Sequence, residues 1–433
     1  MIRTSTLALT LLLAAGAAQS QTAVSGDLLS HIDSLIASIP SGTGSDQYQA
    51  PNALERSIWG TIIDDVLHTR YHTADSLAGI LGYRLLAFHD TETPSQDLHY
   101  ILERTQASSS FWGIYVINLS PLRPNLMIMC PHTLHDRNTG RQGAYVYAAV
   151  APRMLGINGA HRCNSSLFSP CSGTTTVCSD SSQSYRTSDQ AHVTDGLFQA
   201  TTEAMLAFTD STIQIQLHGF SKNATDPDII MSNGTSFAPP PGQDYLAALR
   251  DNLTVVDPTL TFKVGHLDTG WTRLLGTTNV QGRLINGSPA PCTLWASSAT
   301  GHFFHIEQKY SGLRDSQEGW EKMASAITLT FPQTPTDVRT GDQPVPTAFH
   351  VHQNYPNPFN PTTTIELELP EARHTSITVV DLLGRRIALL LDESRAAGTT
   401  RVRWDATAYP SGSYFCLVRA GEWRAMLRLM LVK

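Results

Sequence analysis

The C-terminal part of the chain, residues 349–433, holds sequence patterns that fit short β-strands and tight turns and exclude helices. Pro356, Pro358 and Pro361 fix the backbone torsion φ, lack a hydrogen-bond donor and restrict the residues before them. Apolar and polar residues then alternate with a period of two in the runs 363–369, 376–382 and 401–404. Because turn-forming segments such as Pro410-Ser411-Gly412 separate these runs, we predict an antiparallel all-β domain.

The motifs of this segment follow one another in a fixed order: QNYPNPFNPTTTIELELP from Gln353, VVDLLGRRIALLL from Val379, RVRWDATAYPSGSYFCLVRAG from Arg401, and the terminal LRLMLVK. Together they resemble the C-terminal sorting domain of proteins exported by the type IX secretion system of certain Gram-negative bacteria. The resemblance implies an immunoglobulin-like β-sandwich at residues 347–433, which engages the outer-membrane secretion machinery, with the upstream residues as cargo. Without the resemblance, the same residues also suit an ordinary β-sandwich binding domain.

The N-terminal residues 1–20 have the three parts of a secretory signal peptide. A short basic region at Met1-Ile2-Arg3 precedes the apolar stretch 7–15, and Ala18-Gln19-Ser20 forms a small-residue cleavage site. The apolar stretch is shorter than the roughly 20 residues that a membrane span needs, and the rest of the sequence contains no longer one. We therefore predict export through the periplasm and outer membrane, no transmembrane segment, and a secreted or cell-surface protein.

The composition of the 433-residue chain fits a secreted globular protein. With 41% hydrophobic and 15% charged residues it can bury large cores, and its length suggests two domains. A net charge of -7 without a basic run argues against nucleic acid as a partner. The six cysteines suit disulfides in an oxidising compartment. We expect one local disulfide within the group Cys163, Cys171 and Cys178, with the full connectivity left open.

Residues 21–332 are predicted to form an α/β domain, a mixed sheet with helices on both faces, which a polar, proline-containing linker at 333–346 joins to the β-domain. The apolar patterns predict helices at 28–39, 57–66, 143–155 and 187–208. They predict strands at 83–90, 115–119, 126–130, 212–217 and 303–308.

Histidines and carboxylates follow the predicted strands of this domain. His132 and Asp136 come after the run Leu126–Cys130, His218 ends the run 212–217, and Glu307 lies on the strand 303–308. Because chemistry in α/β sheets gathers at strand ends, these residues can supply three metal ligands, with a carboxylate left over as base. The count of histidines shows no enrichment, so position is the argument. The alternative is that each histidine is structural.

This order of residues is similar to that of the zinc carboxypeptidase-like superfamily, with branches that include poly-γ-glutamate hydrolases, N-formylglutamate amidohydrolases and acylglutamate deacylases. The resemblance covers residues 83–332. It implies zinc bound by His132, Asp136 and His218, Glu307 as the base, and cleavage of an amide bond in a small-molecule or peptide substrate. Most of the superfamily has H-x-x-E where this chain has H-x-x-x-D, which leaves His135 as another ligand or a supporting group.

Three arginines are candidates for stabilising a negative oxygen in the transition state or for holding a substrate carboxylate: Arg162, Arg186 and Arg314. Each also suits a surface ion pair. The loop 159–192 is long and polar, as expected for a substrate-binding wall. In it, Asp189, His192 and Asp195 share one face of the predicted helix, either as a proton relay or as a solvated first turn. Whether His135, His161 or His192 joins the site stays open.

Other enzyme patterns are absent from the sequence, which contains no G-x-S-x-G, H-E-x-x-H or G-x-x-x-x-G-K-[ST]. Cys130 ends an apolar run and is therefore expected to be buried and inert. Two other classes remain open. One is a non-enzymatic secreted surface or binding protein with structural histidines, and the other is a metal-dependent phosphoesterase.

Overall fold

The computed structural model describes residues 23–92, 97–332, 348–354, 357–382, 384–395 and 397–433. The chain divides into two units, residues 1–334 and 335–433, each of which is described by itself. The predicted signal peptide at 1–20 and the predicted linker at 333–346 lie outside the described residues. Within the described part, no helix has both the length and the apolar character needed to cross a membrane.

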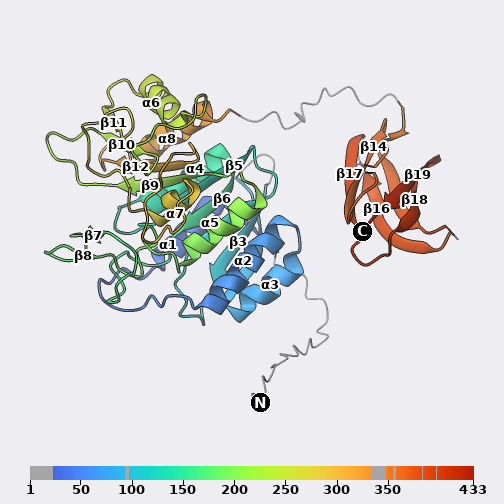
Figure 1. The fold of residues 1–433 in the computed structure, drawn as a ribbon, viewed down its shortest axis with the longest axis horizontal. Helices are drawn as coiled ribbons and strands as arrows, with labels where there is room; N and C mark the ends of the chain where they lie inside the picture. Colours follow the sequence, from blue (N-terminus) through green and yellow to red (C-terminus); the bar gives the residue numbers. More distant parts are fainter. Residues whose placement is uncertain (1–22, 93–96, 333–347, 355–356, 383, 396) are drawn as a thin grey trace, which may run out of the picture. The chain divides into compact units, whose positions relative to one another are not determined.

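The first unit is built on a ten-stranded mixed sheet with the order β1-β2-β3-β4-β6-β5-β9-β12-β10-β11 (Figure 1). Its strands are β1 Ala23–Gly26, β2 Tyr83–Asp90, β3 Leu98–Arg104, β4 Ile114–Asn118, β5 Arg123–Cys130, β6 Pro152–Ile157, β9 Ile213–Gly219, β10 Ile229–Ser232, β11 Phe262–Val264 and β12 Phe303–Gln308. The central strands β6, β5, β9 and β12 are parallel, whereas β2, β3 and β4 pair antiparallel. The predicted mixed α/β sheet is confirmed.

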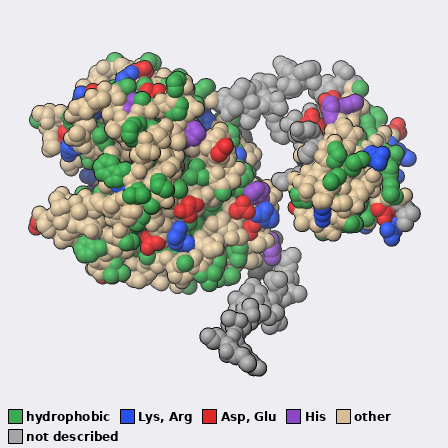
Figure 2. All heavy atoms as spheres, in the orientation of Figure 1, with side chains coloured by type: hydrophobic (Ala, Val, Ile, Leu, Met, Phe, Trp, Pro, Cys, Tyr) green, Lys and Arg blue, Asp and Glu red, His purple; other side chains and the backbone are tan. Residues whose placement is uncertain are grey.

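Two groups of helices pack against this sheet and form separate cores. The helices of the unit are α1 Leu28–Ala37, α2 Ala53–Leu67, α3 Tyr71–Ile80, α4 Thr139–Val150, α5 Leu197–Phe208, α6 Tyr245–Val256, α7 Val280–Ile285 and α8 Gln317–Thr330. Helices α1, α4, α6 and α8 share one cluster of buried residues, and α2, α3 and α5 share another (Figure 1). On the face drawn in Figure 2, hydrophobic side chains are scattered over the surface, and charged side chains are few and dispersed.

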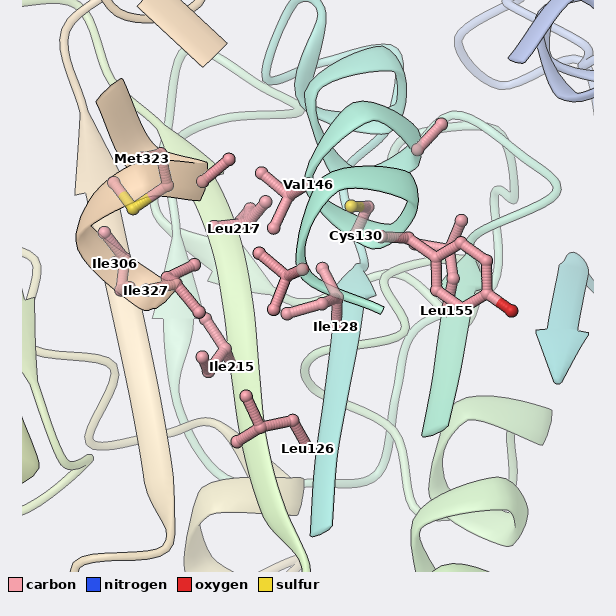
Figure 3. Close-up of a cluster of buried hydrophobic side chains, with 14 of the residues drawn as sticks. Leu126, Ile128, Cys130, Val146, Leu155, Ile215, Leu217, Ile306, Met323 and Ile327 are labelled. Atoms are coloured by element: carbon pink, nitrogen blue, oxygen red, sulfur yellow. The ribbon is translucent and has the colours of Figure 1, made fainter. Parts of the chain in front are cut away.

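Strand β5 shows why the central strands read as continuous apolar runs. Leu126, Ile128 and Cys130 belong to the core under α4 and α8, whereas Met127 and Met129 belong to the core under α2 and α5. A parallel strand covered on both faces has no solvent side, so the alternation of apolar and polar residues disappears. Figure 3 shows side chains of β5, β9 and β12 meeting those of α4 and α8. This packing fixes the strand ends that carry the candidate site.

The predicted helix 143–155 is wrong in its second half. Helix α4 ends at Val150, Ala151 adopts a left-handed φ of 49°, and strand β6 begins at Pro152. Proline cannot donate the helical hydrogen bond, and it disfavours the α conformation of the residue before it. The apolar residues that follow, up to Ile157, pair with β4 and β5 in the middle of the sheet.

The predicted helix 187–208 is wrong in its first half, because α5 begins only at Leu197 after Gly196. The preceding residues form turns that side-chain contacts hold in place. Ser188 Oγ donates to the Arg162 carbonyl at 2.8 Å, and Asp189 accepts from three neighbouring side chains described below. Tertiary contacts therefore override the helical tendency of this segment.

Two disulfides hold the long loop between β6 and α5, which includes the short strands β7 Thr174–Thr175 and β8 Gln183–Ser184. Cys163 pairs with Cys178, which is the expected local disulfide, and Cys171 pairs with Cys292 of a distant loop. Cys130 has a free, buried thiol, and burial raises its pKa above its usual range, as expected for an inert side chain.

The second unit consists of two antiparallel sheets, with strand orders β13-β14-β17 and β16-β15-β18-β19. Its strands are β13 His350–Val351, β14 Thr362–Leu369, β15 Arg373–Val380, β16 Arg386–Arg395, β17 Gly398–Asp405, β18 Gly412–Ala420 and β19 Trp423–Leu431. Alternate residues of β14, such as Ile365 and Leu367, share one buried cluster with Ile377 and Cys416 of the other sheet. The predicted period-two strands are confirmed.

Candidate metal centre

The candidate site forms where three neighbouring parallel strands end. Strands β5, β9 and β12 lie side by side in the sheet, so their carboxyl ends meet at one edge. His132 lies just beyond β5, His218 is the second-last residue of β9, and Glu307 is its direct neighbour in the register of β12. Residues far apart in the sequence are thus brought together, as the strand-end argument predicts.

His132, Asp136 and His218 direct one ligand atom each toward a common point. The His132 Nδ1 atom lies 3.1 Å from Asp136 Oδ2 and 3.1 Å from His218 Nδ1, and the third distance, His218 Nδ1 to Asp136 Oδ2, is 3.4 Å. A triangle of these edges has a circumradius of about 1.9 Å, so a point about 2 Å from all three atoms exists, as zinc bonds to nitrogen and oxygen require. The three side chains are buried.

The hydrogen bonds of His218 fix its tautomer through a chain of amides. The Gln281 Nε2 group donates to the backbone carbonyl of Gln190 at 3.0 Å, so Gln281 Oε1 accepts from Gln216 Nε2 at 3.0 Å. Gln216 Oε1 therefore faces Asn279 Nδ2 at 2.6 Å and His218 Nε2 at 3.1 Å. Because this oxygen only accepts, His218 Nε2 carries the proton, and the lone pair of neutral His218 lies on Nδ1.

Asp189 plays the corresponding part for His132. Its Oδ1 atom accepts from His132 Nε2 at 2.8 Å and from His192 Nδ1 at 2.9 Å, and its Oδ2 atom accepts from Arg162 Nε at 2.9 Å. His132 therefore also presents Nδ1 to the centre, in the carboxylate-histidine arrangement that supports metal ligands. Asp136 Oδ2 is oriented by the backbone N–H of Gly219 at 3.1 Å.

The electrostatics of the cluster favour one added positive charge. Burial opposes ionisation of Asp136, but His132 and His218 outweigh it and hold the pKa of Asp136 well below its usual range. Burial lowers the pKa of His218 to about 4, despite Asp136. Burial and Arg162 also oppose protonation of His132, yet Asp189 and Asp136 outweigh them and raise its pKa. A proton or a metal ion can supply this charge.

The side chain of Glu307 lies beside the cluster. Its side chain is buried, and among the described residues its Oε2 atom has no donor in reach. Burial first, and then Asp136, raise the pKa of Glu307 to about 8. His305 Nε2 lies 3.8 Å from Glu307 Oε1, and the His305 ring packs on His218 with centroids 4.2 Å apart. A nearby cation would lower this pKa and make Glu307 a base at neutral pH.

The candidate arginines occupy three different environments. Arg162 is buried and binds Asp189, and its Nη1 atom lies 3.3 Å from His132 Nδ1. Arg314 is also buried and packs so closely on Gly219 that a Cβ there would lie 2.1 Å from Arg314 Cζ. Arg186 lies apart, where it donates to the Ser166 carbonyl and stacks on an aromatic ring.

A cavity of about 710 Å³ opens beside the cluster. Asp136, Glu307, Arg162 and Arg314 line it, together with the segments that follow β9 and β12. The exposed His135 also lines the cavity, and its ring centroid lies 5.4 Å from that of His161. The geometry therefore joins the candidate metal centre, a buried carboxylate and cationic side chains to a solvent-accessible space.

Sequence reasoning left the partners of the ligands unassigned. Gln216 and His218 belong to a polar face of the buried strand β9, where the pattern Ile-Gln-Ile-Gln-Leu-His alternates. Polar residues on a strand buried on both sides need hydrogen-bond partners. The alternation therefore indicates that Gln216 makes a buried hydrogen bond, without showing to which residue. The sequence predicts Asp189, His192 and Asp195 on one face of a helix, but the helix begins only at Leu197, after these residues.

Comparison with known proteins shows what the second unit is similar to. Residues 353–432 match the family of secretion system C-terminal sorting domains. This is the sorting domain of type IX secretion that the sequence motifs predict. The protein is therefore secreted, to the cell surface or beyond it. A search of the curated proteins finds no relative of this chain.

Similar solved structures include two proteins of Porphyromonas gingivalis. PorZ, an essential bacterial surface component of the type-IX secretion system, is 24% identical over 22% of this chain and 13% of PorZ, with a TM-score of 0.15. Dimeric latent PorU is 14% identical over 20% of this chain and 9% of PorU, with a TM-score of 0.15. An engineered protein is 14% identical over 54% of this chain and 44% of its own, with a TM-score of 0.16. The chain thus spans a small part of PorZ and PorU.

Proposed function

We propose that the protein is a secreted zinc-dependent hydrolase that cleaves an amide or peptide bond, with zinc held by His132, Asp136 and His218. The observation that carries the proposal is the convergence of three ligand atoms whose mutual distances are 3.1, 3.1 and 3.4 Å. Two imidazole nitrogens with lone pairs repel each other unless a proton or a cation lies between them. The donor set of two histidines and one carboxylate is that of catalytic zinc sites.

The remaining groups suit hydrolysis. A zinc ion held there would polarise the substrate carbonyl and lower the pKa of a bound water. Glu307, with its unpartnered buried oxygen, would accept the proton of the attacking water and pass it to the leaving amine. The hydrogen bonds of Arg314 go to the carbonyls of Gln308 and Arg137, so its charge is available to the developing oxyanion. Arg162, which binds Asp189, would position His132.

The proposed division of the chain follows from these assignments. The hydrolase domain comprises residues 21–332, the linker 333–346 and the sorting domain 347–433, for which we propose an immunoglobulin-like sandwich that engages the outer-membrane machinery. A phosphoesterase is the second candidate, because the cationic side chains of the cavity also suit a phosphate group.

The test is the metal content and activity of the purified protein. We expect one zinc per chain by elemental analysis of the purified protein, whereas His132→Ala and His218→Ala should bind zinc too weakly to retain it through purification. The matched control is His99→Ala, because His99 is buried and hydrogen-bonded to Tyr147 in the same unit, away from the cluster. If both cluster variants keep wild-type zinc and stability, the proposed centre is wrong. A panel of amides and phosphate esters, with Glu307→Gln as the inactive reference, separates the two reactions.

A further inference from the structure

The cavity beside the metal cluster gathers positive charge. Six cationic residues line it, against the two carboxylates Asp136 and Glu307: Arg137, Arg162, Lys222, Arg273, Lys309 and Arg314. Some of the six have structural partners, since Arg162 binds Asp189 and Arg273 binds Asp226. A ligand would be bound by those cationic side chains whose charge is not balanced by a neighbouring carboxylate.

Lys222 and Lys309 are placed by the same two strands that carry the cluster. Lys309 follows the last residue of β12, two residues after Glu307, and Lys222 comes three residues after the end of β9. At about 3.4 Å per residue, Lys309 lies about 7 Å beyond Glu307 along the strand direction. This length corresponds to about two residues of an extended peptide.

The two lysines share a single carboxylate. Lys222 Nζ and Lys309 Nζ lie 2.6 and 2.8 Å from the same Oδ1 atom of Asp228. The other oxygen of Asp228 accepts from the backbone N–H and the hydroxyl of Thr261, both at 3.0 Å. Asp228 is buried and fully engaged, so one of the two ammonium charges stays without compensation from it. The lysine side chains are 33% and 28% exposed and reach the cavity.

We propose that Lys222 and Lys309 form an anion subsite that binds a carboxylate of the substrate about two residues from the scissile bond. The enzyme then prefers acidic peptides or amides that carry a second carboxylate. This inference rests on the proposed function, because the metal cluster defines the position of the scissile bond. Partly exposed ammonium groups at the rim of a cavity attract and orient an anionic ligand through charge-assisted hydrogen bonds.

A purely structural role for the lysines makes a different prediction. One lysine is enough to neutralise Asp228, and either single variant, Lys222→Gln or Lys309→Gln, leaves one matched ion pair. Each variant should therefore fold, yet each removes the excess charge. If the lysines serve only Asp228, a single replacement leaves ligand binding unchanged.

The experiment measures peptide binding rather than turnover. Zinc-loaded protein with Glu307→Gln, which prevents cleavage, is titrated calorimetrically with triglutamate and with triglutamine, each acetylated at the N-terminus and amidated at the C-terminus so that only the side chains differ in charge. We expect triglutamate to bind about tenfold more weakly to Lys222→Gln and to Lys309→Gln, as loss of a charged hydrogen bond predicts, and triglutamine to bind all forms alike. The control is Lys263→Gln, because Lys263 has a similar exposure and pairs with Asp268 outside the cavity.

Several outcomes overturn the subsite. Equal binding of triglutamate by wild type and both lysine variants refutes it, and so does an equal loss with triglutamine. Competition by inorganic phosphate at concentrations that leave acetate without effect would assign the subsite to phosphate and refute the carboxylate preference.

Failure of the proposed function gives a different pattern. If the protein binds no zinc while triglutamate binding still depends on the lysines, the hydrolase is wrong and the anion subsite stands. If zinc binds and amides with and without the second carboxylate are cleaved equally, the hydrolase stands and the subsite is wrong.

Discussion

The pH dependence of zinc binding tests the proposed ligand set. In the metal-free protein, Asp189 and Asp136 raise the pKa of His132 in spite of burial. Burial lowers the pKa of His218 to about 4, and the pKa of Asp136 is lowered well below its usual range. Between about pH 5 and pH 6.5, therefore, only one of the three ligands is protonated, and zinc must displace that single proton.

The number of protons that zinc displaces determines how steeply the zinc affinity depends on pH. As the pH falls through the window, zinc affinity should weaken by about tenfold per pH unit, or about 1.4 kcal/mol, in the Glu307→Gln variant. Wild type should release up to one further proton, because the pKa of Glu307 is raised to about 8 without metal and a neighbouring cation lowers it. Calorimetry in buffers of different ionisation enthalpy counts the protons directly.

The variants give the refuting results. A slope of two decades per pH unit in Glu307→Gln, or no slope at all, contradicts the assignment of His132 as the protonated ligand. The matched control is His218→Ala, which should bind zinc more weakly with the same slope, because neutral His218 contributes no proton. Loss of the slope in His218→Ala would exchange the roles of the two histidines.

Three further predictions concern stability and geometry. Glu307→Gln should stabilise the metal-free protein at pH 8 by on the order of 4 kcal/mol and have little effect at pH 5. The reason is that a buried carboxyl with a raised pKa destabilises the folded state as the pH rises and the group ionises. Thermal melts of both proteins at the two pH values measure the difference. Gly219→Ala should displace Arg314 and lower kcat while zinc content stays at the wild-type level. Replacing Cys171 and Cys292 together by serine should lower the free energy of unfolding by about 3–5 kcal/mol in urea titrations, because the disulfide closes a long loop.

The convergence of the candidate ligands was predictable because hydrophobic pattern and topology act together. The apolar runs before His132 and at His218 are buried strands, and parallel neighbours end at the same edge of the sheet. The local sequence therefore indicates which residues lie at the end of a strand, and the order of strands and helices along the chain restricts which strand ends lie side by side. Glu307 belongs to the same group because β12 lies next to β9 in the sheet.

The loop contribution was not predictable by the same means. Arg186 and Asp189 lie three residues apart, yet only Asp189 reaches His132. The turns after Arg186 direct the side chain of Asp189 inward. A helix over this segment would place Asp189 and His192 on one face. Their positions depend on contacts with Arg162 and on two disulfides. The spacing of the cysteines in the sequence does not determine which of them pair.

The amide chain behind His218 shows what limits such predictions. The lone pair of His218 faces the centre because Gln216 accepts from Nε2, and Gln216 is oriented by Gln281, which is anchored on a backbone carbonyl of the loop. A sequence shows that buried strand glutamines need partners, but it does not show which atom of each amide faces which neighbour. The tautomer in which His218 presents Nδ1 to the candidate centre is therefore set by a loop on another part of the chain. Gln281→Leu, which breaks the chain without touching His218, is expected to weaken zinc binding.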